Sequence, residues 1–258
     1  MELPGDREND VSLPGMLCLH AYGTNAAVLR YQLRHITQAL KGVFRFVYVE
    51  APFHVRQPGP GVPPGFSDAH PFRRWHSDKN LAGAFGVPAS DLREERRQVR
   101  ELLGEALETE GQNAHGPGIV GVMAFSQGAA LATALCMDPE LGAGIKFAVI
   151  ICALYPALSL TDDDDGEQLV NYAVTKSSTT CSSPRTVIDI PSIHIQGALD
   201  PWRGQGAKTL GQYFDDGRVR RIQLPGLRHE VPSKVKDAVT IADEVLAVWE
   251  SSREEGKT

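Results

Sequence analysis

Residues 118–137, GIVGVMAFSQGAALATALCM, place a serine where the sequence pattern changes. Residues 118–125 form a continuous apolar run, which is typical of a strand buried on both faces of a parallel sheet. The alanine-rich stretch that follows favours a helix. Ser126 thus stands at a strand–turn–helix junction, and the small residues Ala124 and Gly128 beside it leave room for a sharp turn. This junction predicts an α/β fold with Ser126 at the carboxyl end of a strand.

The same alternation of apolar runs and helical patterns continues along the whole chain. The apolar runs predict about six strands, and the segments between them have the apolar spacing of helices. Such alternation predicts a doubly wound α/β sheet, mostly parallel, with right-handed crossovers. We expect residues 1–258 to form a single domain. The predicted strands are 15–20, 44–50, 118–125, 146–154, 191–198 and 218–224, and the predicted helices are 25–41, 90–111, 127–137, 203–214 and a last helix after Ser233.

Polar residues mark the expected beginnings of these helices. Asn25, Ser90 and Ser233 each fit a helix N-cap, where a short polar side chain accepts a hydrogen bond from a backbone N–H. The last helix is expected to bury a single apolar stripe against the rest of the protein. That stripe consists of Val235, Val239, Ala242, Leu246 and Trp249.

Two long stretches lack this alternation. Residues 51–89 are rich in Pro, Gly and His, and residues 155–190 contain a run of Asp followed by Ser and Thr. Stretches of this length without regular structure are usually lids, binding loops or disordered segments. We expect residues 51–89 to form a partial lid, because they leave the second strand at its carboxyl end. The run Asp162–Asp165 lacks the spaced ligands of a calcium loop and is interpreted as a solvated insertion.

The composition narrows the classes of function. A formal net charge of −6 argues against a nucleic-acid binder, and no stretch approaches the roughly 18 apolar residues of a membrane span. The four cysteines form no C-x-x-C pair, so neither a zinc site nor a disulfide framework is indicated. No nucleotide, flavin or metal motif is present, and we expect no metal and no cofactor. The polar amino terminus is unlike a signal peptide, which predicts a cytoplasmic protein.

Two later segments supply partners for Ser126. Asp200 follows the predicted strand 191–198, and His229 lies in the loop after the predicted strand 218–224. Open α/β sheets place their sites beyond the carboxyl ends of parallel strands, where both residues would lie. Each of the three alone could be an ordinary turn or surface residue. Together and in this order they predict catalysis, in which His229 takes the proton of Ser126 and Asp200 holds the imidazole in the right tautomer.

The loop after the first strand is the candidate oxyanion hole. It reads LCLHAYGTNA over residues 17–26. The expected donors are the backbone N–H groups of Tyr22 and of Gln127, the residue after Ser126. His20 either braces this loop through its ring or takes part in the chemistry, and we favour the bracing role.

With these residues in hand, the chain resembles the fungal serine hydrolases of the FSH group. Within that group it is most similar to the stand-alone thioesterases and esterases of polyketide pathways, such as the lovastatin-pathway type. The resemblance implies an α/β-hydrolase fold, with Ser126, Asp200 and His229 as the triad and Tyr22 and Gln127 as the oxyanion donors. The matching stretches are LCLHAYGTNA, FRFVYVEAPF, PGPGVPPGF with PFRRW, GVMAFSQGAALA, IPSIHIQGALDPW and GLRHEVP, which span roughly residues 16–232.

Two positions depart from the pattern of that family. Ala21 stands where the family usually has Gly after the strand-end His, and Ala124 stands where Gly often opens the turn around the serine. A methyl group at position 21 would tighten the oxyanion loop if that position needed a positive φ. The departures therefore bear on the loop geometry more than on the triad.

The segment 51–89 carries the candidate substrate contacts. Phe66, Phe72 and Trp75 either wall an acyl pocket or pack the segment onto the body of the protein. Arg73 and its neighbour Arg74 either meet the phosphate of a phosphopantetheine arm or form a solvated pair. Arginines and glutamates mixed on the second predicted helix indicate a salt-bridged exposed face, with docking of an acidic carrier protein as the less favoured interpretation. They are Arg93, Arg96, Arg97 and Arg100, with Glu94 and Glu95.

The expected reaction is acyl transfer through an acyl-enzyme on Ser126, which water or a hydroxyl group of the substrate then releases. The resemblance favours release of a polyketide acyl chain from an acyl carrier protein, by hydrolysis or by lactonisation. Two alternatives stay open. One is a general small-molecule carboxylesterase, and the other is a non-catalytic binding protein on a hydrolase scaffold.

Overall fold

The computed structural model describes residues 10–77, 89–112, 116–155, 160 and 188–255, with backbone alone over 89–91. Its centre is a six-stranded sheet in the order β2-β1-β5-β6-β7-β8, and every neighbouring pair of strands is parallel. The predicted parallel α/β sheet is therefore confirmed. The strands are β1 Gly15–Leu19, β2 Arg45–Val49, β5 Ile119–Phe125, β6 Phe147–Ile151, β7 Ser192–Gly197 and β8 Val219–Leu224.

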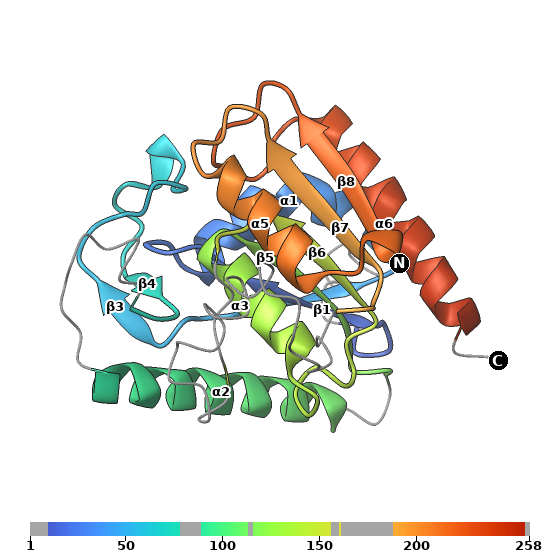
Figure 1. The fold of residues 1–258 in the computed structure, drawn as a ribbon, viewed down its shortest axis with the longest axis horizontal. Coiled ribbons are helices and arrows are strands. Elements are labelled where there is room, and N and C mark those ends of the chain that lie inside the picture. The colour runs from blue at the N-terminus through green and yellow to red at the C-terminus, as the bar shows by residue number, and fades with distance from the viewer. Residues whose placement is uncertain (1–9, 78–88, 113–115, 156–159, 161–187, 256–258) are drawn as a thin grey trace, which may run out of the picture.

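Helices cover both faces of the sheet (Figure 1). One apolar core lies between the sheet and helices α1 and α6, and a second lies between the sheet and α2, α3 and the end of α5. Strands β1, β5 and β6 are buried along their whole length, which explains why their sequences are continuous apolar runs. The helices are α1 Ala26–Ala39, α2 Ala89–Gly111, α3 Gln127–Met137, α5 Arg203–Tyr213 and α6 Val235–Glu255.

The helix beginnings test the predicted N-caps. Asn25 caps α1 as predicted, because its side chain accepts a hydrogen bond from the N–H of Val28 at 2.9 Å. The prediction for Ser90 was wrong, because α2 already begins at Ala89. The prediction for Ser233 was also wrong, since the carbonyl of Lys234 accepts the first helical bond, from Ala238, at 3.0 Å.

The buried face of α6 also differs from the prediction. Val235 and Val239 of the predicted stripe are 61% and 45% exposed. The apolar residues of α6 are spread over more than one face, and the face that packs on α1 and the sheet is the one rotated toward Ile241 and Val245. The fully packed residues are Ala238, Ile241, Ala242, Val245 and Val248, with Leu246 and Trp249 partly buried beside them.

Residues 51–77 lie beside the sheet and contain only short elements. Strands β3, Phe53–Val55, and β4, Phe72–Arg74, form an antiparallel pair at the left of Figure 1, and a short 3-10 helix, η2, covers Pro64–Phe66. This matches the expected absence of long regular structure. Residues 78–88 and most of the second insertion, including Asp162–Asp165, lie outside the described residues.

The connectivity determines where a site can form. The chain passes from β1 outward to β2 and then returns to β5 on the other side of β1. Neighbouring strands whose connections leave in opposite directions open a crevice at their carboxyl ends. Ser126 follows β5 directly, and His20 follows β1 directly. None of the described helices is long and apolar enough to cross a bilayer.

Candidate active site

Ser126 sits in a strained turn between β5 and α3. Its φ of 57° and ψ of −115° are unusual for a residue with a side chain. The turn is held from both sides, because the N–H of Ser126 donates to the carbonyl of Ile151 at 3.0 Å and Gly128 lies directly against β1. A Cβ atom at Gly128 would come within 2.3 Å of the Leu19 carbonyl oxygen. Glycine is therefore required there for α3 to begin so close to the first strand.

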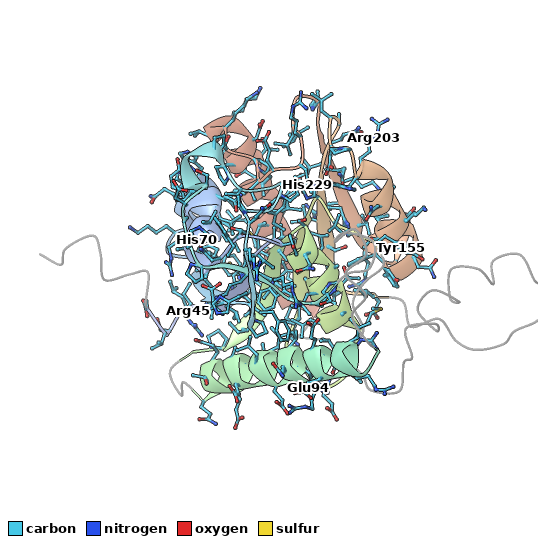
Figure 2. The ribbon with its side chains drawn as sticks, turned by 90° about the vertical axis from the view of Figure 1, so that its left-hand side faces the viewer. Arg45, His70, Glu94, Tyr155, Arg203 and His229 are labelled. Atoms are coloured by element: carbon cyan, nitrogen blue, oxygen red, sulfur yellow. The ribbon has the colours of Figure 1, made fainter. Side chains whose placement is uncertain are left out.

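The structure brings the three predicted catalytic side chains into one hydrogen-bonded chain. The Nε2 atom of His229 lies 2.8 Å from Ser126 Oγ, and its Nδ1 atom lies 3.0 Å from Asp200 Oδ2. All three residues are buried, with 4%, 7% and 3% of Ser126, His229 and Asp200 exposed. They come from the loops after β5, β8 and β7, and the label in Figure 2 shows His229 at the upper end of the sheet.

The carboxylate of Asp200 accepts several hydrogen bonds. Its Oδ1 accepts from the N–H of Trp202 at 2.8 Å, and its Oδ2 also accepts from the side-chain amide of Gln196 at 2.9 Å. Burial acts to raise the pKa of Asp200, but the hydrogen bonds from His229 and Trp202 outweigh it and hold that pKa below its ordinary value. Asp200 is therefore a carboxylate near neutral pH, and its acceptor role requires the proton of neutral His229 to lie on Nδ1. The free Nε2 lone pair then faces the hydroxyl of Ser126, as a general base requires.

Two aromatic side chains enclose the imidazole. The ring of Phe125 lies 5.2 Å from the ring of His229, and the ring of Trp202 meets it edge-on at 4.5 Å. Neither Phe125 nor Trp202 was predicted to contact the histidine. Their places in the sequence could have indicated this contact. Phe125 directly precedes Ser126 and Trp202 lies two residues after Asp200, so both are close in the chain to residues that contact His229.

The predicted oxyanion donors are in suitable local settings. Among the described residues, the backbone N–H groups of Tyr22 and Gln127 have no hydrogen-bond acceptor. The loop that carries Tyr22 is fixed at Gly23, whose N–H donates to the Arg73 carbonyl at 2.8 Å and whose φ is 67°. Ala21 is not among the described residues with positive φ, so its methyl group is accommodated without backbone strain.

His20 braces the loops around the site, which confirms the favoured of its two roles. Its Nδ1 lies 2.8 Å from the carbonyl of Ala21, and its Nε2 accepts from the N–H of Ala51 at 3.1 Å. The side chain is fully buried. Its own carbonyl accepts from the indole N–H of Trp75 at 2.7 Å. His20 thus ties the end of β1 to the residues after β2 and β4.

The structure corrects the substrate role expected for Phe72 and Trp75. Both side chains are 0% exposed, so they pack residues 72–77 onto the body of the protein and wall no open pocket. The N–H of Trp75 donates to the side-chain oxygen of Gln127 at 2.9 Å, and the side-chain amide of Gln127 donates to the His76 carbonyl at 3.1 Å. Their aromatic size therefore serves to seat this segment beside the oxyanion loop.

The neighbouring arginines, Arg73 and Arg74, also contact other parts of the protein. Arg73 donates to the carbonyls of Ala51 and Pro52 at 3.2 and 3.3 Å. Arg74 pairs with Glu95 of α2 at 2.8 Å. Both guanidinium groups are thus held in place by neighbouring residues, and Arg73 Nε and Arg74 Nη1 are buried without a hydrogen-bond partner. Phe66 is partly buried and its ring lies 4.6 Å from the ring of Tyr31 on α1.

Only part of the predicted salt-bridged face of α2 is present in the structure. Arg97 pairs with Glu94 and Glu101 on the exposed side of the helix, where Glu94 points away from the sheet (Figure 2). Glu95 and Arg100 differ from the prediction, because Glu95 is buried against Arg74 and Arg100 pairs with Asp138 at the end of α3. Glu95 and Arg100 thus link α2 to neighbouring segments.

A cavity of about 600 Å³ opens beside the triad. His229, Trp202 and the proline-rich stretch around Val62 line it. Gly61 in this stretch packs closely on Phe125, since a Cβ atom at position 61 would meet the ring of Phe125 at 2.6 Å. The side chains of Arg34 and Arg228 also line the cavity.

The model of the FSH1 serine hydrolases matches residues 12–241 of the sequence. The chain belongs to this family. Thioesterase FSL2 of Gibberella zeae is 42% identical to this family member over 246 residues, which cover 95% of the chain and 96% of the relative. Esterase pigG of Monascus ruber is 30% identical over 268 residues, with 95% and 96% covered.

A further relative is a thioesterase named for a nonaketide synthase. The dihydromonacolin L-[lovastatin nonaketide synthase] thioesterase of Aspergillus terreus is 29% identical over 240 residues, which cover 88% of each chain. Among solved structures, Arabidopsis thaliana SOBER1 has a TM-score of 0.55 at 14% identity and covers 92% of this chain and 100% of its own. Zea mays acyl-protein thioesterase 2 has a TM-score of 0.54 at 17% identity, with 93% and 95% covered. These structures show the α/β-hydrolase fold, and the family shows that the chain is a serine hydrolase.

Proposed function

We propose that this hydrolase releases a polyketide acyl chain from the phosphopantetheine arm of an acyl carrier protein. The observation that carries the proposal is the hydrogen-bonded chain Ser126–His229–Asp200, whose His229 lines a cavity of about 600 Å³. The thioesterases among the relatives support it. Three further parts of the proposal are a lid role for residues 51–89, a single domain and a cytoplasmic setting.

The proposed mechanism uses each side chain in one role. His229 Nε2 takes the proton of Ser126 as Oγ attacks the thioester carbonyl, and Asp200 stabilises the imidazolium that forms. The N–H groups of Tyr22 and Gln127 hold the oxyanion. His229 then protonates the leaving thiolate, and the acyl-enzyme is opened by water or by a hydroxyl of the chain itself.

The proposed substrate contacts follow the cavity. Val62 and Trp202 would hold the acyl chain, and Arg34 and Arg228 replace Arg73 and Arg74 as candidates for the phosphate of the arm. Within the described parts of the chain neither Arg34 nor Arg228 forms an ion pair. The guanidinium of Arg34 donates to the Tyr31 carbonyl at 2.9 Å and lies over that ring, which leaves further N–H groups for an anion.

A serine-directed phosphonate tests the nucleophile. We expect one equivalent to label the wild-type protein and none to label Ser126→Ala. Equal labelling of both would remove Ser126 from the mechanism, and no labelling of the folded wild type would favour the non-catalytic binding protein.

The substrate class is tested by comparing matched acyl donors. A long-chain acyl thioester on a pantetheine arm should have a kcat/KM at least about tenfold above that of p-nitrophenyl acetate, after correction for leaving-group reactivity. Tenfold requires only about 1.4 kcal/mol of additional transition-state binding. Equal values, with no gain from chain length, would favour the general carboxylesterase, which the esterases among the relatives make the second candidate.

A further inference from the structure

Cys152 is a buried thiol next to the triad that the mechanism above does not use. It follows β6 directly, is 0% exposed and has a φ of 47°, in the left-handed region that side chains rarely adopt. Its N–H donates to the carbonyl of Ile195 on β7 at 2.9 Å, so it lies beside the strand that leads to Asp200. The thiol sulfur, a carboxylate oxygen of Asp200 and a ring nitrogen of His229 all lie within 4.8 Å of one another.

The contacts of the sulfur reach both sides of the histidine. Sγ lies 3.9 Å from the carbonyl of Arg228 and 3.8 Å from the carbonyl of Glu230, the residues before and after His229. Sγ also lies within 4.8 Å of a carboxylate oxygen of Asp200. One small side chain thus lies beside the acid of the triad and contacts the loop that carries the base.

The thiol remains protonated in this position. Burial raises the pKa of Cys152 to about 12, and the negative charge of Asp200 acts in the same direction. The group is therefore a neutral S–H donor at physiological pH, because a nucleophile or a metal ligand would require the thiolate.

We propose that Cys152 is a positioning residue of the triad, which holds the Asp200 carboxylate against Nδ1 of His229 and supports the loop from Arg228 to Glu230. Besides His229, the donors to Asp200 are the side-chain amide of Gln196 on β7 and the N–H of Trp202 in the turn after it. Cys152 comes from the end of the neighbouring strand, β6, and its sulfur lies within 4.8 Å of both the acid and the base. This inference rests on the proposed hydrolase mechanism.

Substitution of Cys152 tests the inference through the pH dependence of the reaction. In Cys152→Ala, Asp200 loses the neighbouring S–H dipole, so its charge is less compensated and it attracts the imidazolium form of His229 more strongly. We expect kcat for a short ester to fall about threefold to tenfold with KM nearly unchanged, and the acidic limb of kcat/KM to move to higher pH. Cys152→Ser keeps a donor at the same place and should restore both kcat and the position of that limb.

Cys136→Ala is the matched control. Cys136 is a thiol of α3 that packs in the core between α2 and the sheet, and burial raises the pKa of this thiol as well. It should change stability without moving the pH profile. A Cys152→Ala protein with the wild-type pH profile and kcat would overturn the inference, as would a Cys152→Ser protein that shares the full defect of Cys152→Ala. Phosphonate labelling of wild-type Ser126 reports on the proposed function separately, and failure there would not be confused with failure here.

Discussion

At the scale of single residues, the site depends on a few positions that local preference alone would not populate. Holding Ser126 at a φ of 57° costs on the order of 1–3 kcal/mol. The surrounding contacts enforce it, since the N–H of Ser126 is bonded to Ile151 and Gly128 fits against the carbonyls that end β1. The nucleophile is thus presented by a turn that only this packing makes stable.

Replacement of Asp200 by Asn tests the acid at the same scale. The shape of the side chain is kept, but an amide that donates toward Nδ1 would favour the wrong tautomer of His229. We expect kcat to fall by roughly 10⁴, the loss seen when the equivalent change is made in a serine protease. Asp243→Asn, on the exposed side of α6, is the control and should leave kcat unchanged. Near-normal turnover of Asp200→Asn would mean that another group supports His229.

At the scale of elements, the residues after β4 act as a brace for the oxyanion loop. The indole N–H of Trp75 donates to the carbonyl of His20, and the backbone N–H of Trp75 donates to the side-chain oxygen of Gln127. Trp75→Ala should lower the free energy of unfolding by about 3–5 kcal/mol, the usual cost of removing a buried aromatic ring. Chemical denaturation measures this.

The kinetics of the same variant separate packing from substrate binding. Because the ring is fully buried, the effect of Trp75→Ala on KM should be similar for acetyl and long-chain esters. Trp75→Phe keeps most of the volume and should recover most of the stability. A selective rise in KM for long acyl chains would instead restore the acyl contact expected from the sequence.

The contact between α2 and the end of α3 predicts how the stability of the protein changes at low pH. Asp138 accepts from the N–H groups of Glu140 and Leu141 at 3.0 and 2.9 Å and pairs with Arg100. Burial acts to raise the pKa of Asp138, but these bonds outweigh it and leave the pKa below the ordinary value of 3.8. A depressed pKa means that the stabilisation is complete above the unfolded value and is lost as the pH falls through the folded one.

Asp138→Asn should therefore be less stable than the wild type at pH 7 and converge on it in acid. The expected difference at pH 7 is about 1.5–3 kcal/mol, as for hydrogen bonds to a charged group. Denaturation midpoints measured from pH 7 down to below pH 3.8 check this. A difference that stays constant over that range would show that the charge of Asp138 contributes little.

At the scale of the whole molecule, the crevice between β1 and β5 gathers segments that lie far apart in the sequence. Ser126, His229, Asp200 and the loop of Tyr22 all follow strands of one parallel sheet. The proline-rich stretch near Val62, Trp202 and His229 come together to line the cavity. The loops that line the cavity would thus limit the size of the substrate, and the sheet positions the side chains proposed for the chemistry.

Filling that cavity should discriminate between acyl chains. Val62→Trp adds a large side chain to one wall, so we expect kcat/KM for a long acyl ester to fall at least about tenfold and that for an acetyl ester to change less than about threefold. Val62→Ala is the matched variant and should preserve both activities. An equal loss for both esters in Val62→Trp would place the acyl chain elsewhere.

The sequence by itself determined the sheet, its helices and the identity of Ser126, Asp200 and His229. Continuous apolar runs indicate strands that are buried on both faces. Because each of the three residues follows a strand of a parallel sheet, all three lie at the same edge of that sheet. These features depend on local pattern and on connectivity, both of which are present in the linear chain.

Only the tertiary structure decided which apolar and polar side chains serve packing and which serve the site. Phe72 and Trp75 lie in the core and not in the cavity, α6 buries the face of Ile241 in place of that of Val239, and Cys152 meets Asp200 across neighbouring strands. A buried aromatic and a substrate-contacting aromatic have the same sequence pattern. What separates them is the set of neighbours that folding brings from distant segments, because burial and hydrogen-bond partners depend on packing between elements.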